Sequence, residues 1–396
     1  MRYRFGDCML DGARRELSRG GALIPVEPQV FDLIELLIRN CDRVVTRDDL
    51  IAHVWHGRIV SESTLATRIN AARKAIGDDG TAQRLIKTVA RKGVRFVGTV
   101  QTDAGDDPWT LDRAADLDQQ ISFCRTSDGV SLAVSAVGNG PPLVKAANWL
   151  NHLEYDWQSP IWSPMLRRLA ARFRLIRYDG RGNGLADWEA ADVSFAAFCR
   201  DLETVVATLD LPRFVLLGLS QGAATAVAFA VAHPDRVSRL ILYGGYPQGR
   251  NRRGSADDAA TAQTVLGMMR QGWGRADSAF MRAFASLYLP NGSPEQIRWF
   301  AEMQKLTTSG DMAARLRVAC DDIDIVELLP RLRVPTLVLH ARDDHVVPVA
   351  QSRMMAAMIP GARFATLPSE NHVPLPDEPA WELLLKEIEC FVAAPS

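Results

Sequence analysis

The stretch 214–224 carries a serine in a setting that suits nucleophilic catalysis. It reads as an apolar strand that runs into GLSQG (218–222), followed by a helix of small residues. Between a strand and a helix, a G-x-S-x-G pattern is typical of a sharp turn that lifts the serine hydroxyl above a sheet. Gly218 and Gly222 leave room there for the strand and the helix to pack closely. We therefore predict that Ser220 is a nucleophile.

A serine nucleophile needs a general base and an acid that orients the base, and both follow in the chain. Asp344 lies 124 residues after Ser220, in a loop that follows an apolar strand, and His372 lies 28 residues further on. His372 would accept the serine proton and return it to the leaving group, while Asp344 would hold the imidazole tautomer. Asp343 is the alternative acid. This set predicts attack on an ester, lactone or amide bond.

The elements around these residues alternate along the chain. Six short apolar runs between 143 and 367 are separated by helix-length segments, which predicts a mainly parallel sheet with helices on both faces. A helical stretch at about 247–325, rich in methionine and aromatic residues, interrupts this order. We expect it to form a cap over the site. Its side chains either line an apolar ligand pocket or pack as ordinary helical core.

The GLSQG turn, the acid loop TLVLHARDDHVVP (336–348) and the SENH run (369–372) together resemble the alpha/beta-hydrolase superfamily over about 125–393. The resemblance implies an α/β hydrolase fold with a helical cap for residues 120–396. It places the acid at Asp344, with Ala341 where the family's G-x-x-D-x-x-V-P pattern has glycine. It also implies an oxyanion hole made by the backbone N–H groups of Gln221 and Trp149. Trp149 stands in ANW (147–149), where family members often carry His-Gly.

A further match to that family is the turn YDGRGNGLAD (178–187) after the fourth strand. Its glycines and Arg181 are expected to brace the loop beside the site rather than to take part in chemistry.

The first 100 residues differ from the rest in charge. They hold 17 lysines and arginines against 12 acidic residues, whereas the remainder holds 29 against 35. The net charge of −1 is thus the sum of a basic first part and an acidic second part. This suggests that only the first domain meets a polyanion. Its pattern predicts strands at 3–10 and 13–17, helices at 27–40, from Thr46 and at 61–76, and a hairpin at 86–97. The acidic segment 101–119 is interpreted as a linker.

Four stretches of this small α+β domain, residues 1–100, resemble the OmpR/PhoB-type winged helix in the same order and spacing. They are VEPQVFDLIELLIRN, RVVTRDDLIAHVW, SESTLATRINAARKAIGDD and RLIKTVARKGVRF. In such domains the third helix enters the major groove and the hairpin wing touches the minor groove. The resemblance implies these DNA-facing residues: Thr64, Thr67, Arg68, Ala71 and Lys74 on the helix, and Arg91 and Lys92 at the wing tip. Arg68 is the candidate for a guanine contact. An ordinary solvated basic face is the alternative.

The composition narrows the functional classes. The chain has 396 residues, 47% hydrophobic and 23% charged, as expected for two or three soluble domains. Six cysteines are scattered without metal-ligand spacing, so we expect reduced thiols and neither a metal nor a cofactor. No apolar run suits a signal peptide or a membrane span, which predicts a cytoplasmic protein with no membrane partner.

Two functions fit these features. One is a DNA-binding transcriptional regulator whose hydrolase-fold domain binds, with or without turnover, a small molecule. The other is a serine hydrolase with the winged helix as an accessory domain. The partners expected are double-stranded DNA and a small-molecule ligand or substrate. A homodimer and contact with RNA polymerase stay open as hypotheses.

Overall fold

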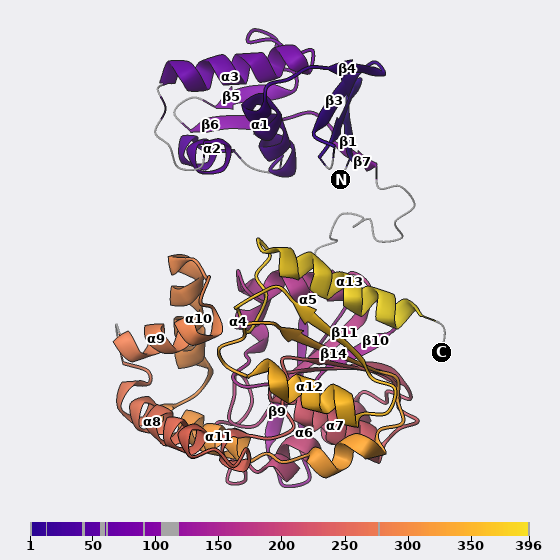
Figure 1. Cartoon of the computed structure of the whole chain (residues 1–396), viewed down its shortest axis with the longest axis vertical. Coiled ribbons are helices and arrows are strands. Elements are labelled where there is room, and N and C mark those ends of the chain that lie inside the picture. Colours follow the sequence, from indigo (N-terminus) through magenta and orange to yellow (C-terminus); the bar gives the residue numbers. More distant parts are fainter. Residues whose placement is uncertain are drawn as a thin grey trace. The chain divides into compact units, whose positions relative to one another are not determined.

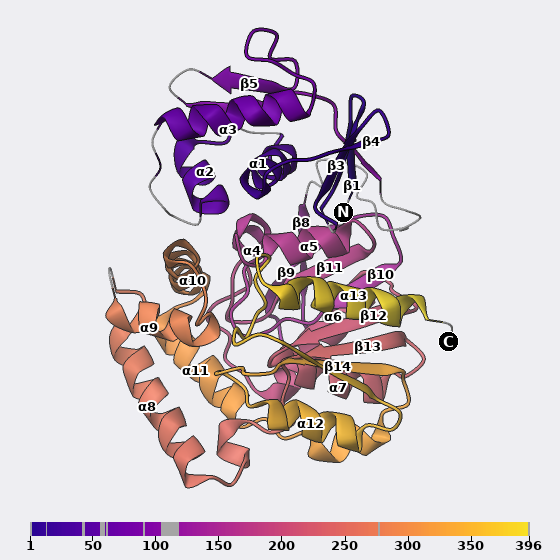
Figure 2. The same cartoon turned by 45° about the horizontal axis from the view of Figure 1, so that its top comes forward.

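The protein folds into two compact units, residues 1–112 and 113–396, and each is described by itself. The computed structural model in Figures 1 and 2 describes all residues except 1, 13, 42–43, 56–59, 61, 90–91, 104–118, 276–277 and 395–396.

The first unit contains an antiparallel sheet of five strands in the order β4-β3-β2-β1-β7. The strands are β1 (Arg2–Phe5), β2 (Cys8–Asp11), β3 (Glu16–Arg19), β4 (Ala22–Ile24) and β7 (Gln101–Asp103). Strands were expected at 3–10 and 13–17, and β4 is additional. Its three residues are too few and too exposed to show an alternating pattern.

Three helices and a hairpin complete the first unit, as the sequence predicted. They are α1 (Pro28–Arg39), α2 (Arg47–Val54), α3 (Glu62–Ala75), β5 (Ile86–Val89) and β6 (Gly93–Phe96). Thr46 starts α2 by a reciprocal cap, in which its hydroxyl accepts from the N–H of Asp49 and the Asp49 carboxylate accepts from the N–H of Thr46. Phe5 and Phe96 pack edge to face at 5.3 Å, which joins the sheet to the hairpin.

The predicted linker at 101–119 is wrong at both ends. Gln101–Asp103 form β7, which pairs with β1, so strands from both ends of the first unit belong to the same sheet. Three residues in an acidic stretch give no periodic signal, and only the pairing register reveals this strand. At the other end, Gln119 belongs to the second unit, because its side chain donates to the carbonyl of Leu153 at 3.1 Å. Residues 104–118 lie outside the described residues.

The second unit is built on an eight-stranded sheet in the order β15-β14-β13-β12-β10-β11-β9-β8. The strands are β8 (Gln120–Arg125), β9 (Ser131–Val137), β10 (Pro142–Lys145), β11 (Arg174–Asp179), β12 (Phe214–Leu219), β13 (Val237–Tyr243), β14 (Thr336–Ala341) and β15 (Arg363–Leu367). The six strands from β10 to β15 are parallel, as predicted, whereas β9 is antiparallel to both of its neighbours, β11 and β8. The sequence pattern did not predict the strands β8 and β9.

Helices cover both faces of this sheet, because successive residues of each buried strand point to opposite sides. Leu143 and Leu217 pack on the face covered by α5 and α13, whereas the neighbouring Val144 and Leu216 pack on the face covered by α6, α7 and α12. These helices and α4 span α4 (Leu153–Gln158), α5 (Ser163–Ala170), α6 (Phe195–Thr208), α7 (Gly222–Ala232), α12 (Val349–Met358) and α13 (Pro379–Ala393). Among the described residues, no helix combines the length and apolarity that crossing a membrane requires.

Among the described residues, four helices are inserted between β13 and β14, within the segment 247–325 that the sequence predicted as a cap. They gather at one side of the unit in both views (Figures 1 and 2). They are α8 (Ala256–Gly272), α9 (Ala279–Tyr288), α10 (Pro294–Thr307) and α11 (Gly310–Asp321), flanked by the 3₁₀ helices η1 (Arg250–Arg252) and η2 (Val326–Arg331). The entry and exit of the insertion meet at a bridge between Gln248 and Asp324.

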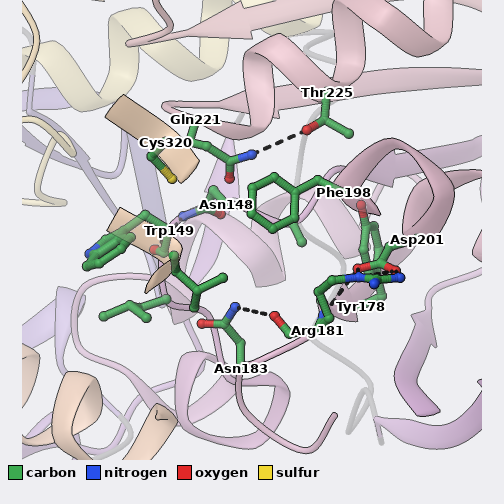
Figure 3. A pocket seen from close by; sticks show the side chains of 14 residues that line it. Asn148, Trp149, Tyr178, Arg181, Asn183, Phe198, Asp201, Gln221, Thr225 and Cys320 are labelled. Atoms are coloured by element: carbon green, nitrogen blue, oxygen red, sulfur yellow. Dashed lines mark hydrogen bonds and ion pairs between the residues drawn. The ribbon is translucent and has the colours of Figure 1, made fainter. Parts of the chain in front are cut away.

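The turn after β11 is braced by Arg181, which is fully buried. Its guanidinium donates to Asp201 at 2.7 Å, to Asp128 at 2.8 Å and to the carbonyl of Asp192 at 2.9 Å. Figure 3 shows Arg181 against Asp201. Burial alone would lower the pKa of Arg181, but hydrogen bonds to the two carboxylates raise it above its usual range. These bonds are those of a structural brace, the role that the sequence predicted for this residue.

We predict that Arg181→Met lowers the free energy of unfolding of the second unit by about 3–5 kcal/mol, because it leaves the buried Asp201 carboxylate without its partner. Urea denaturation of the full chain measures this loss. Arg200→Met is the matched control: Arg200 is half-exposed and bonds the same Asp128, so its loss should stay below about 1 kcal/mol. Equal losses in the two variants would contradict the bracing role.

Candidate active site

Ser220 occupies the turn between β12 and α7 in a left-handed backbone conformation, with φ of +50°. Its N–H donates to the carbonyl of Tyr243 on β13 at 2.8 Å, which holds the turn. A Cβ on Gly222 would lie 2.7 Å from the carbonyl oxygen of Ala147, and Gly218 is as tightly enclosed. The two glycines thus allow the close packing that the sequence pattern predicted.

His372 and Asp344 form a hydrogen-bonded pair, with Nδ1 of the histidine 2.6 Å from Oδ2 of the aspartate. The other carboxylate oxygen accepts from the N–H groups of Val346 and Val347 at 2.7 and 3.1 Å. Burial alone would raise the pKa of Asp344. The charge of His372 and hydrogen bonds from His340 and His372 outweigh burial and hold that pKa well below its usual range. Asp344 is therefore a stable anion beside the imidazole.

His340 on β14 is a further member of this group, and the sequence analysis missed it. It is fully buried, and its Nε2 lies 3.3 Å from Oδ2 of Asp344 and 2.9 Å from the carbonyl of Val347. Because both contacts of Nε2 are oxygen acceptors, this nitrogen acts as the hydrogen-bond donor to them. Its position at i−4 from the acid was the available signal. The exposed Asp343, the alternative acid, instead donates its N–H to the carbonyl of Ser369.

Ser220 and His372 line one small cavity of about 20 Å³, together with Trp149, Tyr288 and Phe300. In the described part of the chain, no hydrogen bond joins the Ser220 hydroxyl to the imidazole; such bonds often tighten only when a ligand binds. Tyr288, at the end of α9, packs edge-on against His372 at 5.5 Å, and its carbonyl accepts from the His372 N–H at 2.8 Å. The cap thus closes over the serine with aromatic side chains.

The two N–H groups predicted for an oxyanion hole belong to residues that line a cavity with Ser220. Gln221 precedes the first turn of α7, where backbone N–H groups have no partner within the helix. Among the described residues, the N–H groups of Trp149 and Gln221 have no acceptor. Figure 3 shows Asn148, Trp149 and Gln221 around an adjoining cavity, where the Gln221 amide donates to Thr225 at 3.3 Å.

Buried charges support the loop that carries Trp149. The ammonium of Lys145 donates to the side chain of Asn148, and the Asn148 amide donates to the carbonyl of Trp149 at 3.2 Å. Burial lowers the pKa of Lys145 to about 8, against the opposing charge of Asp156. Burial also raises the pKa of Asp156 to about 6, against the charges of Arg177 and Lys145. This network fixes the loop in place of the His-Gly that the family often carries.

In the first unit, three of the residues that the sequence placed against DNA are half-buried, namely Thr64, Arg68 and Ala71. Arg68 forms an ion pair with Glu27, which precedes α1, and Ala71 packs against the core of the unit. Arg68 therefore reaches a base edge only if Glu27 releases it. This partner lies outside α3, just before α1, and no sequence pattern links the two.

The exposed line of α3 consists of Ser63, Ala66, Thr67, Asn70 and Lys74. Thr67 and Lys74 belong to the predicted DNA-facing set, whereas the other three do not. The predicted set and the exposed set have the same spacing of three and four residues, and both are partly polar. The sequence therefore cannot tell which of the two sets faces outward. The exposed residues of α3 therefore lie about one position before most of the residues that the sequence predicted to face DNA.

The wing is tied to α3 by Arg73, which the sequence analysis did not single out. Its guanidinium donates to the carbonyl of Ile86 at 3.0 Å and to the hydroxyl of Thr88 at 2.9 Å. Between α3 and the hairpin lies a groove of about 440 Å³, and Lys92 is exposed along it. Arg91, the other wing residue predicted to meet DNA, lies outside the described residues.

Comparison with known proteins assigns each unit separately. A family model described as alpha/beta hydrolase fold matches residues 151–379, and one described as transcriptional regulatory protein, C terminal, matches residues 21–96. These matches confirm the fusion of a winged helix with a hydrolase fold.

Individual relatives match the hydrolase fold. The chain is 27% identical to pimeloyl-[acyl-carrier protein] methyl ester esterase of Nitrosomonas europaea, over 62% of this chain and 93% of the esterase. It is also 27% identical to AB hydrolase superfamily protein YisY of Bacillus subtilis, over 63% and 91% of the two chains. A solved hydrolase from Pseudomonas aeruginosa is 26% identical, with a TM-score of 0.58, over 69% of this chain and 99% of its own.

We predict that Gly222→Ala lowers the free energy of unfolding by about 1–3 kcal/mol, because its Cβ would press on the backbone of the loop before Trp149. Thermal unfolding of the full chain tests this. Gly267→Ala is the control, since that glycine lies within α8 with open space around it, and the variant should gain about 0.5–1 kcal/mol. A stable Gly222→Ala variant would show that the turn is looser than described.

Proposed function

Because the chain belongs to the alpha/beta hydrolase fold family and also carries a winged-helix transcriptional regulatory domain, we propose that it is a DNA-binding transcriptional regulator that binds, and can hydrolyse, a small molecule. The observation that carries this proposal is the 2.6 Å hydrogen bond between His372 and Asp344, next to a serine at a strained strand–helix turn. A domain that only holds a fold together does not need these groups. The cytoplasmic location remains a prediction.

In this proposal Ser220 attacks the carbonyl carbon of the ligand, and His372 takes the hydroxyl proton. Asp344, kept ionised by its donors, stabilises the imidazolium that forms. The N–H groups of Trp149 and Gln221 would stabilise the oxyanion of the tetrahedral intermediate. His372 then donates its proton to the leaving group, and water releases the acyl group by the reverse sequence.

On the first unit, we assign DNA contact to the exposed Thr67, Lys74 and Lys92. Arg91 stays in this set on the sequence alone. Lysines on exposed surface contact phosphates, which position the protein on the duplex. Arg68 is retained as a base-reading residue that exchanges Glu27 for DNA.

The second candidate function is a working hydrolase with the winged helix as an accessory domain. The similarity to a methyl ester esterase favours turnover of an ester. The two functions differ in one respect: a regulator changes its affinity for DNA when the site near Ser220 is occupied, and an accessory winged helix does not.

We predict that the full-length protein binds DNA from the region upstream of its own gene, with an affinity that falls as salt rises. Lys74→Gln should weaken this binding and reduce the slope of log affinity against log salt by about one. Electrophoretic mobility shifts at several salt concentrations measure both. Lys386→Gln, the same change on the exposed side of α13, should leave the slope unchanged. An unaltered slope in Lys74→Gln would remove that residue from the DNA interface.

We also predict turnover of p-nitrophenyl esters by the wild type and its loss in Ser220→Ala. Asp344→Asn should lower kcat by about 10⁴-fold, because the imidazole loses the anion that fixes its tautomer. Asp343→Asn is the matched control, and we expect it to retain wild-type turnover because Asp343 is exposed. If the wild type neither hydrolyses such esters nor reacts at Ser220 with a fluorophosphonate, the serine is not an activated nucleophile.

A further inference from the structure

A second cavity next to Ser220 has an unusual charge balance. Among the described residues, its lining includes Ser220 and three arginines, Arg250, Arg253 and Arg317, but only one carboxylate, that of Asp321. The volume of about 20 Å³ leaves room for about one water molecule. A larger group therefore enters only when the cap shifts. The arginines come from the cap, since two lie at its entry and one lies on α11.

Two of these arginines have carboxylate partners. Arg317 binds Asp321 through two hydrogen bonds, at 2.6 and 2.9 Å, one turn along α11. Arg253 lies 3.5 Å from Asp258 at the start of α8. Both guanidiniums also lie 5.9 Å from an aromatic ring, that of Trp149 for Arg317 and that of Tyr246 for Arg253. These contacts hold the two cations in fixed positions.

Arg250 has no such partner. In the described part of the chain, no carboxylate lies within 4 Å of its guanidinium, and its one hydrogen bond is to the carbonyl of Val346 at 3.3 Å. Burial lowers the pKa of Arg250, and the charge of Arg317 lowers it further, against the opposing charge of Asp321. Half-buried cations in proteins are normally paired, because an unpaired one loses hydration without compensation. Among the described residues, no anionic side chain forms an ion pair with the Arg250 guanidinium.

We propose that this cavity binds an anionic oxygen group of the ligand, a carboxylate or a phosphate, while the reacting bond of the same ligand lies at Ser220. This deepens the proposed function and rests on it. An arginine offers planar donors that suit either anion, and the neighbouring Arg317 adds to the field. Since Arg317 also lies over Trp149, the bound anion sits next to the loop that carries one predicted oxyanion N–H.

Boronic acids test the proposal without turnover. The Ser220 oxygen bonds to boron, its proton passes to His372, and the adduct is an anionic tetrahedral boronate with no leaving group. We would measure the Kd of full-length protein for 4-boronobutanoic acid and for its uncharged amide, by tryptophan fluorescence. An analogue with a phosphonate in place of the carboxylate distinguishes the two anions. We expect at least one of the acids to bind about tenfold or more tightly than the amide.

Variants of Arg250 test whether this residue causes the tighter binding of the acid than of the amide. Arg250→Gln should reduce the ratio of the two Kd values, acid against amide, to near one, whereas Arg250→Lys should retain part of it. Arg252→Gln is the matched control, because Arg252 is an exposed arginine of the same 3₁₀ helix that does not line the cavity. Its ratio should equal that of the wild type.

The outcomes separate this inference from the function on which it rests. Equal binding of acid and amide by the wild type, or an unchanged ratio in Arg250→Gln, overturns the anion site alone. Failure of all the boronic acids to bind contradicts the nucleophile at Ser220, and with it both proposals.

Discussion

The backbone at Ser220 is the constraint on which the candidate site depends. A φ of +50° at a non-glycine residue costs of order 1–3 kcal/mol and persists only when the surroundings enforce it. Here β13 holds the turn through the carbonyl of Tyr243, while Gly218 and Gly222 allow α7 and the loop at Ala147 to close around it. With this left-handed backbone, Ser220 belongs neither to β12, which ends at Leu219, nor to α7, which begins at Gly222. Its hydroxyl is thereby free to meet groups from elsewhere in the chain.

The topology of the sheet supplies those groups. β12, β14 and β15 are parallel strands, so the segments that follow them emerge at one edge, as ligand-binding loops do in other α/β folds. Ser220 follows β12, Asp344 follows β14 and His372 follows β15. Residues more than a hundred positions apart are thus brought together by strand order alone. The charge of His372 and the hydrogen bonds of His340 and His372 then keep the Asp344 carboxylate ionised.

What the sequence predicted well is what local patterns encode. The strand–turn–helix around Ser220, the cap of α2 at Thr46 and the alternation of strands and helices each depend on neighbouring residues. The failures depend on distant partners. The strand β7 exists only because its three residues pair with β1, and Arg68 forms an ion pair with Glu27, which lies 41 residues earlier in the chain. The cavity lined by Arg250, Arg253 and Arg317 brings together side chains from both ends of the cap, so no spacing in the sequence predicts it.

In the proposed function, one chain couples a reactive small-molecule site to DNA. Its most direct test is the Kd of the full-length protein for its upstream DNA before and after a fluorophosphonate has occupied Ser220, with Ser220→Ala treated in parallel. A coupled regulator should change its affinity by about fivefold or more, a typical allosteric effect, and the variant should not change. The same Kd for labelled and unlabelled wild type would contradict the claim and leave a hydrolase with an independent DNA-binding domain.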